Sequence, residues 1–222
     1  MSNPLHHESK KEFQLERLIL FSDAVFAIAI TLLVIEIRVP ELHDDYTDTA
    51  LLKKLGQLVP KFLGFIISFF IIGRYWVVHH TIFGFVTRYD AKLIRLNLFF
   101  LFTIVLMPFT NGLYGEYSAP HTMHLITPVA FYAGNVCLTG LTNYMLYSYV
   151  SNPKHKLAEF PSENYVREGK MRSLIVPSIF LLSIPVAMFN GYLARYVPIL
   201  IPIVMGFVAR RFRSKHANIQ TA

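Results

Sequence analysis

The chain has 222 residues, of which 54% are hydrophobic and only 16% are charged, against roughly one quarter charged in a typical soluble domain. One cysteine excludes an internal disulfide scaffold, and 11 glycines and 12 prolines exclude collagen-like and low-complexity chains. With a mean hydropathy of +0.43, this composition indicates an integral membrane protein, so the net charge of +7 has to be interpreted from the positions of the basic residues.

Six apolar runs follow one another along the chain, and each predicts a membrane-spanning helix. The first five approach the roughly 20 residues that a span requires, whereas the sixth is shorter. A short helix still crosses where the bilayer thins or where its ends snorkel, and the alternative is five spans with a re-entrant or interfacial helix. The predicted spans are 18–35, 62–85, 93–113, 126–150, 174–194 and 196–209.

The basic residues are unevenly divided between the two sides of this predicted all-α bundle. With the N-terminus in the cytoplasm, fifteen lie inside, five lie outside and Arg74 lies within a span. This bias satisfies the positive-inside rule, so both termini are predicted to be cytoplasmic. No nucleic-acid-binding motif is present, and the positive charge instead indicates orientation and contact with anionic lipids. We expect one domain over 1–222 in the cytoplasmic membrane, with cytoplasmic tails at 1–16 and 210–222.

A few polar side chains interrupt the first three spans, where each needs a partner or a function because charge in hydrocarbon is costly. They are Ser22, Asp23, Thr31, Arg74, Trp76, His79, His80 and Asn97. The two histidines point about 100° apart, so a regular helix cannot aim both at one metal ion. An intramembrane enzyme is not expected, because the motifs H-E-x-x-H and G-x-S-x-G are absent.

The first predicted span has two different faces. At about 100° per residue, four small or apolar side chains fall within roughly 60° of one another, and Leu32 lies at their edge. Asp23 lies about 140° away from Ile28, on nearly the opposite side. By itself such a stripe is more typical of packing than of a pore, and such a carboxylate is more typical of a paired structural charge. The stripe consists of Ala24, Ile28, Thr31 and Ile35.

The start of the first span also carries a recognisable motif. Arg17-Leu-Ile-Leu-Phe21-Ser22-Asp23 reproduces the R-x-x-x-F-S-D signature, and the chain therefore resembles the prokaryotic relatives of transmembrane protein 175, the lysosomal potassium channel of animals. The resemblance covers nearly the whole chain except the tails, although the last two spans match mainly in length and hydrophobicity. It continues through 27–33, Trp76, His79-His80, Asn97 and Pro108-Phe109.

This resemblance implies a homotetramer of six-span subunits, with a pore lined by four copies of the first span and no re-entrant filter loop. The chain agrees in lacking the T-V-G-Y-G filter of ordinary potassium channels. By position, the resemblance places the hydrophobic constriction at Ile28, with Leu32 and Ile35 above it. It assigns to Thr31 the hydroxyl ring that selects potassium.

The other polar residues are assigned by the resemblance to a structural network that holds the first span against its neighbours. These are Arg17, Ser22, Asp23, Trp76, His80 and Asn97, and the sequence leaves open whether His79 or His80 makes the bond. The expected function is a passive cation channel with a modest preference for potassium over sodium. Its expected partners are potassium ions, other copies of the chain and membrane lipids, without a cofactor or resident metal. The alternative is a proton channel, or a proton-coupled transporter that uses Asp23, His79 or His80.

Overall fold

The computed structural model describes residues 4–42, 46–119, 121–197, 200–201, 204 and 206, and this part of the chain is built from helices joined by loops. The all-α prediction is therefore confirmed. The helices are α1 (Pro4–Ile35), α2 (Asp48–Gln57), α3 (Val59–Phe83), α4 (Ala91–Val105), α5 (Met107–Glu116), α6 (Ile126–Val150), the 3-10 helix η1 (Pro153–His155), α7 (Glu163–Phe189) and α8 (Gly191–Tyr196).

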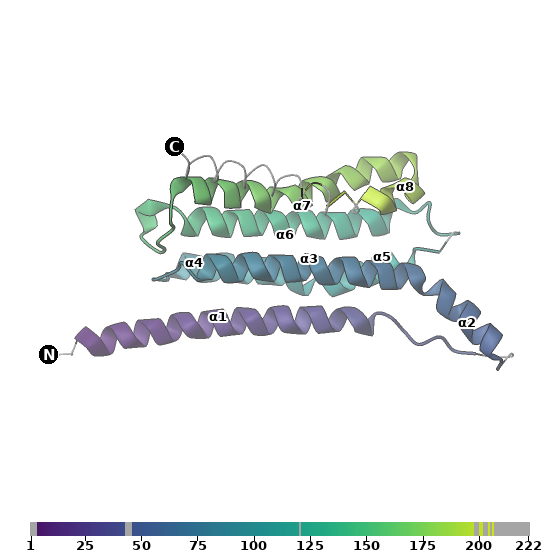
Figure 1. Cartoon of the computed structure of the whole chain (residues 1–222), viewed down its shortest axis with the longest axis horizontal. Coiled ribbons are helices and arrows are strands. Elements are labelled where there is room, and N and C mark those ends of the chain that lie inside the picture. The colour runs from purple at the N-terminus through teal and green to yellow at the C-terminus, as the bar shows by residue number, and fades with distance from the viewer. Residues whose placement is uncertain are drawn as a thin grey trace, which may run out of the picture.

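The long helices lie side by side in three layers. Figure 1 shows α1 along one edge, α3, α4 and α5 in the middle, and α6, α7 and α8 along the opposite edge. Helix α1 packs on α3, α4 and α5, while α6 packs most closely on α7. One flank of α1 is therefore covered by the middle layer, and its other flank faces away from the bundle.

Four of the predicted spans, the first, second, third and fifth, correspond to helical stretches that are long and apolar enough to cross a membrane, but the fifth, predicted over 174–194, is interrupted at Asn190, where α7 ends. Within the described residues these stretches are Glu12–Ile35, Val59–Phe83, Ala91–Glu116 and Glu163–Phe189. The fourth predicted span is helix α6, which has the expected boundaries, is not one of these four stretches and carries the amides of Asn135 and Asn143. Most of the sixth, 196–209, lies outside the described residues, so the count of six spans stays a prediction.

Two features depart from a simple series of straight spans. The loop expected between the first two spans contains α2, which is capped where Thr47 Oγ1 accepts a hydrogen bond from the Ala50 amide. The third predicted span is divided into α4 and α5 near Leu106, just before Pro108. Proline lacks an N–H and its ring clashes with the preceding turn, which accounts for the break.

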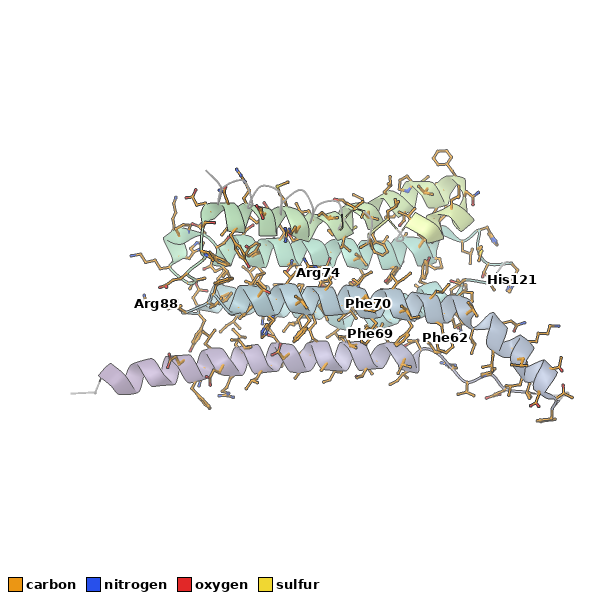
Figure 2. All side chains as sticks on the ribbon, viewed as in Figure 1. Phe62, Phe69, Phe70, Arg74, Arg88 and His121 are labelled. Atoms are coloured by element: carbon orange, nitrogen blue, oxygen red, sulfur yellow. The ribbon has the colours of Figure 1, made fainter. Side chains whose placement is uncertain are left out.

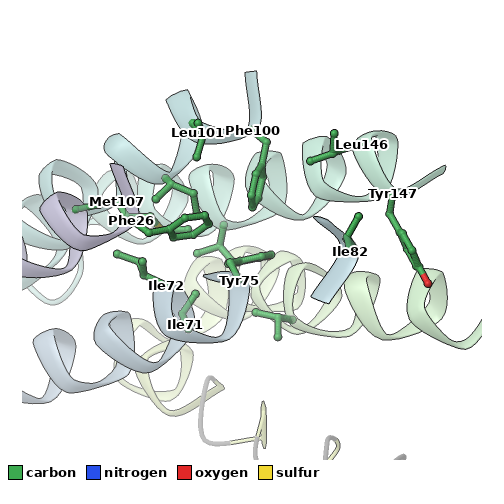
Figure 3. Packing of buried hydrophobic residues seen from close by; sticks show 14 of the residues in the cluster. Phe26, Ile71, Ile72, Tyr75, Ile82, Phe100, Leu101, Met107, Leu146 and Tyr147 are labelled. Atoms are coloured by element: carbon green, nitrogen blue, oxygen red, sulfur yellow. The ribbon is translucent and has the colours of Figure 1, made fainter. Parts of the chain in front are cut away.

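The core joins the first two layers through aromatic packing. Phe26 of α1 and Tyr75 of α3 both contact Phe100 of α4, with ring centroids 5.8 and 6.0 Å apart. Figure 3 shows these side chains gathered with Ile72 in the middle of the bundle. Because close-packed aromatic rings resist sliding, this cluster restricts the position of α1 along α3 and α4.

At the predicted cytoplasmic end, the loop between α3 and α4 is tied to the loop between α6 and α7. The amides of Thr87 and Arg88 donate to the carbonyl of Leu157 at 2.9 and 3.1 Å, and the amide of Glu159 donates to the carbonyl of Phe85 at 2.9 Å. These bonds form the single bridge between extended segments in the described chain. The middle and outer layers are therefore joined at this end as well as through their helices.

Asp90 joins the same two regions through its side chain. Its carboxylate caps α4 by accepting from the Leu93 amide at 2.7 Å, and it accepts from Tyr149 Oη of α6 at 2.5 Å. Burial raises the pKa of the Asp90 carboxyl, but the hydrogen bonds from Tyr149 and from the α4 amides outweigh this, so the pKa lies below its ordinary value. The charged, bond-accepting form is thereby favoured.

Close approach of α6 and α7 depends on a glycine. A Cβ atom added at Gly140 would lie 2.3 Å from Pro177 Cγ, which is far inside van der Waals contact. Gly134, on the same helix, has no neighbour within 4 Å of an added Cβ and is exposed. Gly140 therefore lets the two helices meet, whereas Gly134 does not serve that purpose within the subunit.

We expect Gly140→Ala to lower the thermal unfolding midpoint of the purified protein in detergent. Overpacking of this kind typically costs about 1–3 kcal/mol, because the two helices must move apart. The matched control is Gly134→Ala, which should leave the midpoint unchanged or slightly raised since alanine favours helix. Equal midpoints for the two variants would contradict the proposed α6–α7 contact.

Candidate functional site

Helix α1 presents one buried face and one exposed face within the subunit. The buried side chains follow a helical spacing and pack against the middle layer; they are Ser22, Phe26, Ala29 and Leu33. On the other face, Ile28 is 58% exposed and Ile35 is 66% exposed, and Thr31 is also exposed. The stripe predicted from helical rotation is therefore a continuous, mainly apolar surface on the flank of α1 that faces away from the bundle.

Thr31 is the polar member of this exposed stripe. Its hydroxyl lies 3.0 Å from the carbonyl oxygen of Ala27 and 2.9 Å from that of Ile28, and it donates its proton within the helix. A hydroxyl has one donor and two acceptor lone pairs. Because the proton is directed to the α1 backbone, the hydroxyl oxygen is left as the group that can accept a contact from outside, as a cation would require.

A directed chain of hydrogen bonds joins three helices on the buried side of α1. His79 Nε2 of α3 lies 2.8 Å from Asn97 Oδ1 of α4, and Asn97 Nδ2 donates to Ser22 Oγ of α1 at 2.9 Å. The Ser22 hydroxyl then donates to the Leu18 carbonyl at 2.8 Å. Since an amide oxygen only accepts, His79 Nε2 is the protonated ring nitrogen in this arrangement.

The His79 ring is held rigidly where it makes this bond. It is fully buried, stacks on Phe83 with ring centroids 4.2 Å apart, and lies between Phe26 and Phe100 at 5.5 and 5.8 Å. An aromatic cage of this kind restricts the ring to one orientation. The donor therefore points at Asn97 without a large entropic cost when the bond forms.

A second hydrogen bond links α1 to α3 beside this chain. The indole Nε1 of Trp76 donates to Asp23 Oδ1 at 2.9 Å. Trp76 is partly exposed, and its ring lies 5.6 Å from that of His80. Asp23 therefore points toward α3 and away from the exposed stripe, as the angle between Asp23 and Ile28 requires.

The structure brings together four residues of the sequence-predicted network and separates two. Ser22, Asp23, Trp76 and Asn97 form the contacts described above. Of the two histidines, His79 makes the bond, because position 79 lies on the α3 face that packs against α1 and α4, whereas position 80 is exposed. Arg17 is exposed beside Tyr89 and Leu98, in a shallow groove between α1 and α4, away from the hydrogen-bond chain.

Within the described part of the chain, no group of three or more His, Cys, Asp or Glu side chains is arranged to hold a metal ion. His79 and His80 take different environments, one caged in the core and one exposed. The arrangement as a whole is an exposed apolar helix face that carries a hydroxyl, held in place from behind by buried polar bonds.

The chain is similar to known channels. The family model described as "Endosomal/lysosomal potassium channel TMEM175" matches residues 17–108. A protein of Chamaesiphon minutus named a potassium channel is 30% identical over 187 residues, which cover 84% of this chain and 91% of that protein. A potassium channel of Streptomyces collinus is 40% identical over 97 residues, covering 44% of this chain and 46% of the relative.

Animal relatives and a solved structure extend this similarity. The protein named "Endosomal/lysosomal proton channel TMEM175" in Gallus gallus is 34% identical over 108 residues, covering 46% of this chain but only 22% of that protein. The crystal structure of a lysosomal potassium-selective channel TMEM175 homolog from Chamaesiphon minutus superposes with a TM-score of 0.72 at 29% identity. That superposition covers 89% of this chain and 97% of the crystallised one.

We expect His79→Phe to destabilise the protein more than His80→Phe. Phenylalanine preserves the ring packing at position 79 but removes the donor to Asn97 Oδ1, leaving a buried acceptor unpaired. The cost should fall between about 0.6 kcal/mol, the average for interhelical bonds in membranes, and about 3 kcal/mol for a buried unpaired group. Thermal unfolding midpoints in detergent measure the difference, and a larger loss for His80→Phe would argue against the bonding described here.

Proposed function

The chain belongs to the TMEM175 family, and from this premise we propose that it is a multi-pass membrane channel that conducts potassium ions. The observation that carries the proposal is the 30% identity with a potassium channel of Chamaesiphon minutus over 91% of that relative. Four helical stretches able to cross a membrane agree with a channel subunit. The activity is passive conduction, so no catalytic residue is assigned.

The pore is formed by four copies of the chain, with one α1 helix from each around a common axis. The exposed stripe on α1 supports this assembly, because a single subunit leaves Ile28, Leu32 and Ile35 uncovered on the flank of α1 opposite α3, α4 and α5. In the tetramer these side chains turn inward, and Ile28 forms the narrowest ring. The remaining outer surfaces contact lipid, and both termini lie in the cytoplasm, with the channel in the cytoplasmic membrane.

A ring of isoleucine side chains cannot replace the hydration shell of an ion. It controls conduction by diameter and by dewetting, so the open state must be wide enough for a partly hydrated cation. Thr31 lies one helical turn beyond Ile28 and presents the hydroxyl oxygen to the axis. Four such oxygens compensate part of the lost hydration, which gives a modest preference for potassium over sodium.

The buried polar residues determine which face of α1 reaches the axis. Rotating α1 by one residue would turn Ile28 by about 100° and would also break the bond between Ser22 and Asn97. Such bonds contribute little energy individually in membranes. Their contribution to the channel is the rotational position of α1, and the ion itself does not contact them.

Proton conduction is the second candidate function. It is favoured by the names of the animal relatives, which are proton channels and match this chain over part of its length. A wetted ring holds a column of hydrogen-bonded water, which is one route along which protons move. Proton and potassium flux therefore have to be measured separately on the same protein.

The test is reconstitution of the purified protein into potassium-loaded liposomes. A membrane-permeant proton carrier is added in one arm and omitted in the other, and a pH-sensitive dye in the lumen reports the flux. If the protein conducts potassium, potassium efflux draws protons in through the carrier, so the lumen acidifies only in the arm that contains the carrier. If the protein conducts protons, a pH gradient imposed across the membrane dissipates in the arm without the carrier. Flux equal to that of protein-free liposomes in both arms would reject the channel.

We expect Ile28→Asn to raise single-channel conductance in planar bilayers, because asparagine wets the constriction and removes the dewetting barrier. The matched control is Ile28→Leu, which keeps the side-chain volume and polarity and should conduct like the original chain. Unchanged currents in Ile28→Asn would exclude this side chain from the pore.

We expect Thr31→Val to move the potassium-to-sodium permeability ratio toward 1, since valine has nearly the same shape but no hydroxyl oxygen. Thr31→Ser is the control, because it retains the hydroxyl and should retain most of the preference. The ratio is obtained from reversal potentials under bi-ionic conditions. An unaltered ratio in Thr31→Val would show that the preference arises elsewhere.

A further inference from the structure

Arg17, the first residue of the recognised motif, takes no part in the buried contacts of α1. It is exposed beside Tyr89 and Leu98, in a shallow groove of about 340 Å³ between α1 and α4. Glu16, which precedes it, is also exposed. Figure 2 shows side chains along α1 that project from the flank facing away from the other helices. One subunit therefore presents a basic and an acidic group at the predicted cytoplasmic end of α1.

Neither of these two charges is paired within its own subunit. Among the described residues no carboxylate lies within 4.0 Å of Arg17, and no basic nitrogen lies within 4.0 Å of the Glu16 carboxylate. Adjacent residues of a helix point about 100° apart, so the two do not face each other. The positions three and four residues away, where a helix makes its own ion pairs, hold no basic residue for Glu16 and no acidic residue for Arg17. An ion pair of either residue therefore requires a group outside the described subunit.

The rotation of α1 places the two charges on opposite sides of Thr31. At about 100° per residue, Arg17 is turned about 40° to one side of Thr31 and Glu16 about 60° to the other. In a square ring of four parallel helices, the two neighbours of each helix lie about 45° to either side of the direction to the axis. With Thr31 toward the axis, Arg17 is directed at one neighbouring α1 and Glu16 at the other.

Symmetry also brings the two charges to the same level. A rotation about the pore axis leaves the height of every residue unchanged, and adjacent residues of a helix differ by only about 1.5 Å along it. Arg17 of one copy and Glu16 of the next copy therefore lie at nearly the same height. Where two α1 axes pack about 8–10 Å apart, these long side chains reach each other.

We infer that four ion pairs, each between Arg17 of one copy and Glu16 of the next copy, join the α1 helices into a ring at the predicted cytoplasmic entrance. The inference rests on the proposed tetramer. An arginine and a carboxylate can form two parallel hydrogen bonds, which fix orientation as well as attraction. Since an apolar stripe gains little from association in lipid, these directional pairs supply a specificity that isoleucine and leucine do not.

The pairing also affects the entrance of the pore. Arg17 lies only about 20° from Ile28 around α1, so it belongs to the same face of the helix. Four unpaired guanidinium groups there would repel an approaching cation. Glu16 of the next copy offsets that charge without a separate acidic ring.

The test is charge reversal, with native mass spectrometry reporting the fraction of tetramer as the detergent-purified protein is diluted. Glu16→Arg and Arg17→Glu each set like charges together four times in the ring, so half-assembly should require about tenfold more protein. Combining Glu16→Arg with Arg17→Glu exchanges the charges and should restore assembly. The matched control is Arg88→Glu, which reverses an exposed charge at the same end of the protein (Figure 2) and should assemble as the original chain does.

Salt tests the same pairs in a second way. At about 1 M ionic strength the Debye length is about 3 Å, so the attraction in the original chain and the repulsion in the single variants are both screened. The difference between them should then largely disappear. Both positions are exposed, so the substitutions leave the packing within the subunit intact.

The inference is overturned if the original chain is tetrameric and the single variants assemble equally well, or if the difference persists at high salt. It is also overturned if the combined variant assembles no better than the single ones, a result that would assign Arg17 to another anionic group such as a lipid phosphate. An original chain that stays monomeric at every concentration would overturn the proposed tetramer, and the ion pairs with it.

Discussion

The rotational position of α1 depends on the hydrogen-bond chain that connects His79, Asn97 and Ser22. In hydrocarbon an unpaired polar group cannot form a hydrogen bond with water instead. Each of these three side chains is therefore paired only when the helices that carry the other two are in register. Apolar packing alone would tolerate sliding or rotation between similar side chains. The buried polar bonds select one arrangement, and the aromatic cage around His79 makes that arrangement rigid.

This internal anchoring explains how α1 can lie at the edge of the subunit and still be well positioned. Lipid tails are as apolar as isoleucine, so an exposed stripe of isoleucine and leucine gains little from association by hydrophobic burial in the membrane. Contacts between subunits therefore cannot be relied on to orient α1. Its orientation is set within the subunit by Ser22 and Asp23, and the exposed face is then available to the proposed assembly.

Much of this arrangement could be predicted from the sequence, and the exceptions have physical reasons. The boundaries of α6 follow from a run without charge between polar loops. The break near Leu106 lies inside a run that the sequence predicts as one span, and Pro108 accounts for it. The choice between His79 and His80 could not be made, because adjacent positions differ by a rotation whose absolute direction depends on tertiary packing. The meeting of Arg74 with Arg172, about a hundred positions apart in the chain, likewise depends on how α3 and α7 pack.

Helix α3 lies between α1 and the layer of α6 and α7, and its side chains contact different neighbours on opposite faces. Taking Arg74 as the origin and about 100° per residue, Val78 lies near 40° whereas His79 and Trp76 lie near 140° and 200°. Arg74 and Val78 face α6 and α7, whereas His79 and Trp76 face α1 and α4. Rotation of α3 would break the bonds that Trp76 and His79 make with Asp23 and Asn97. Substitutions on the face of α3 that looks away from α1 therefore leave the contacts with α1 intact.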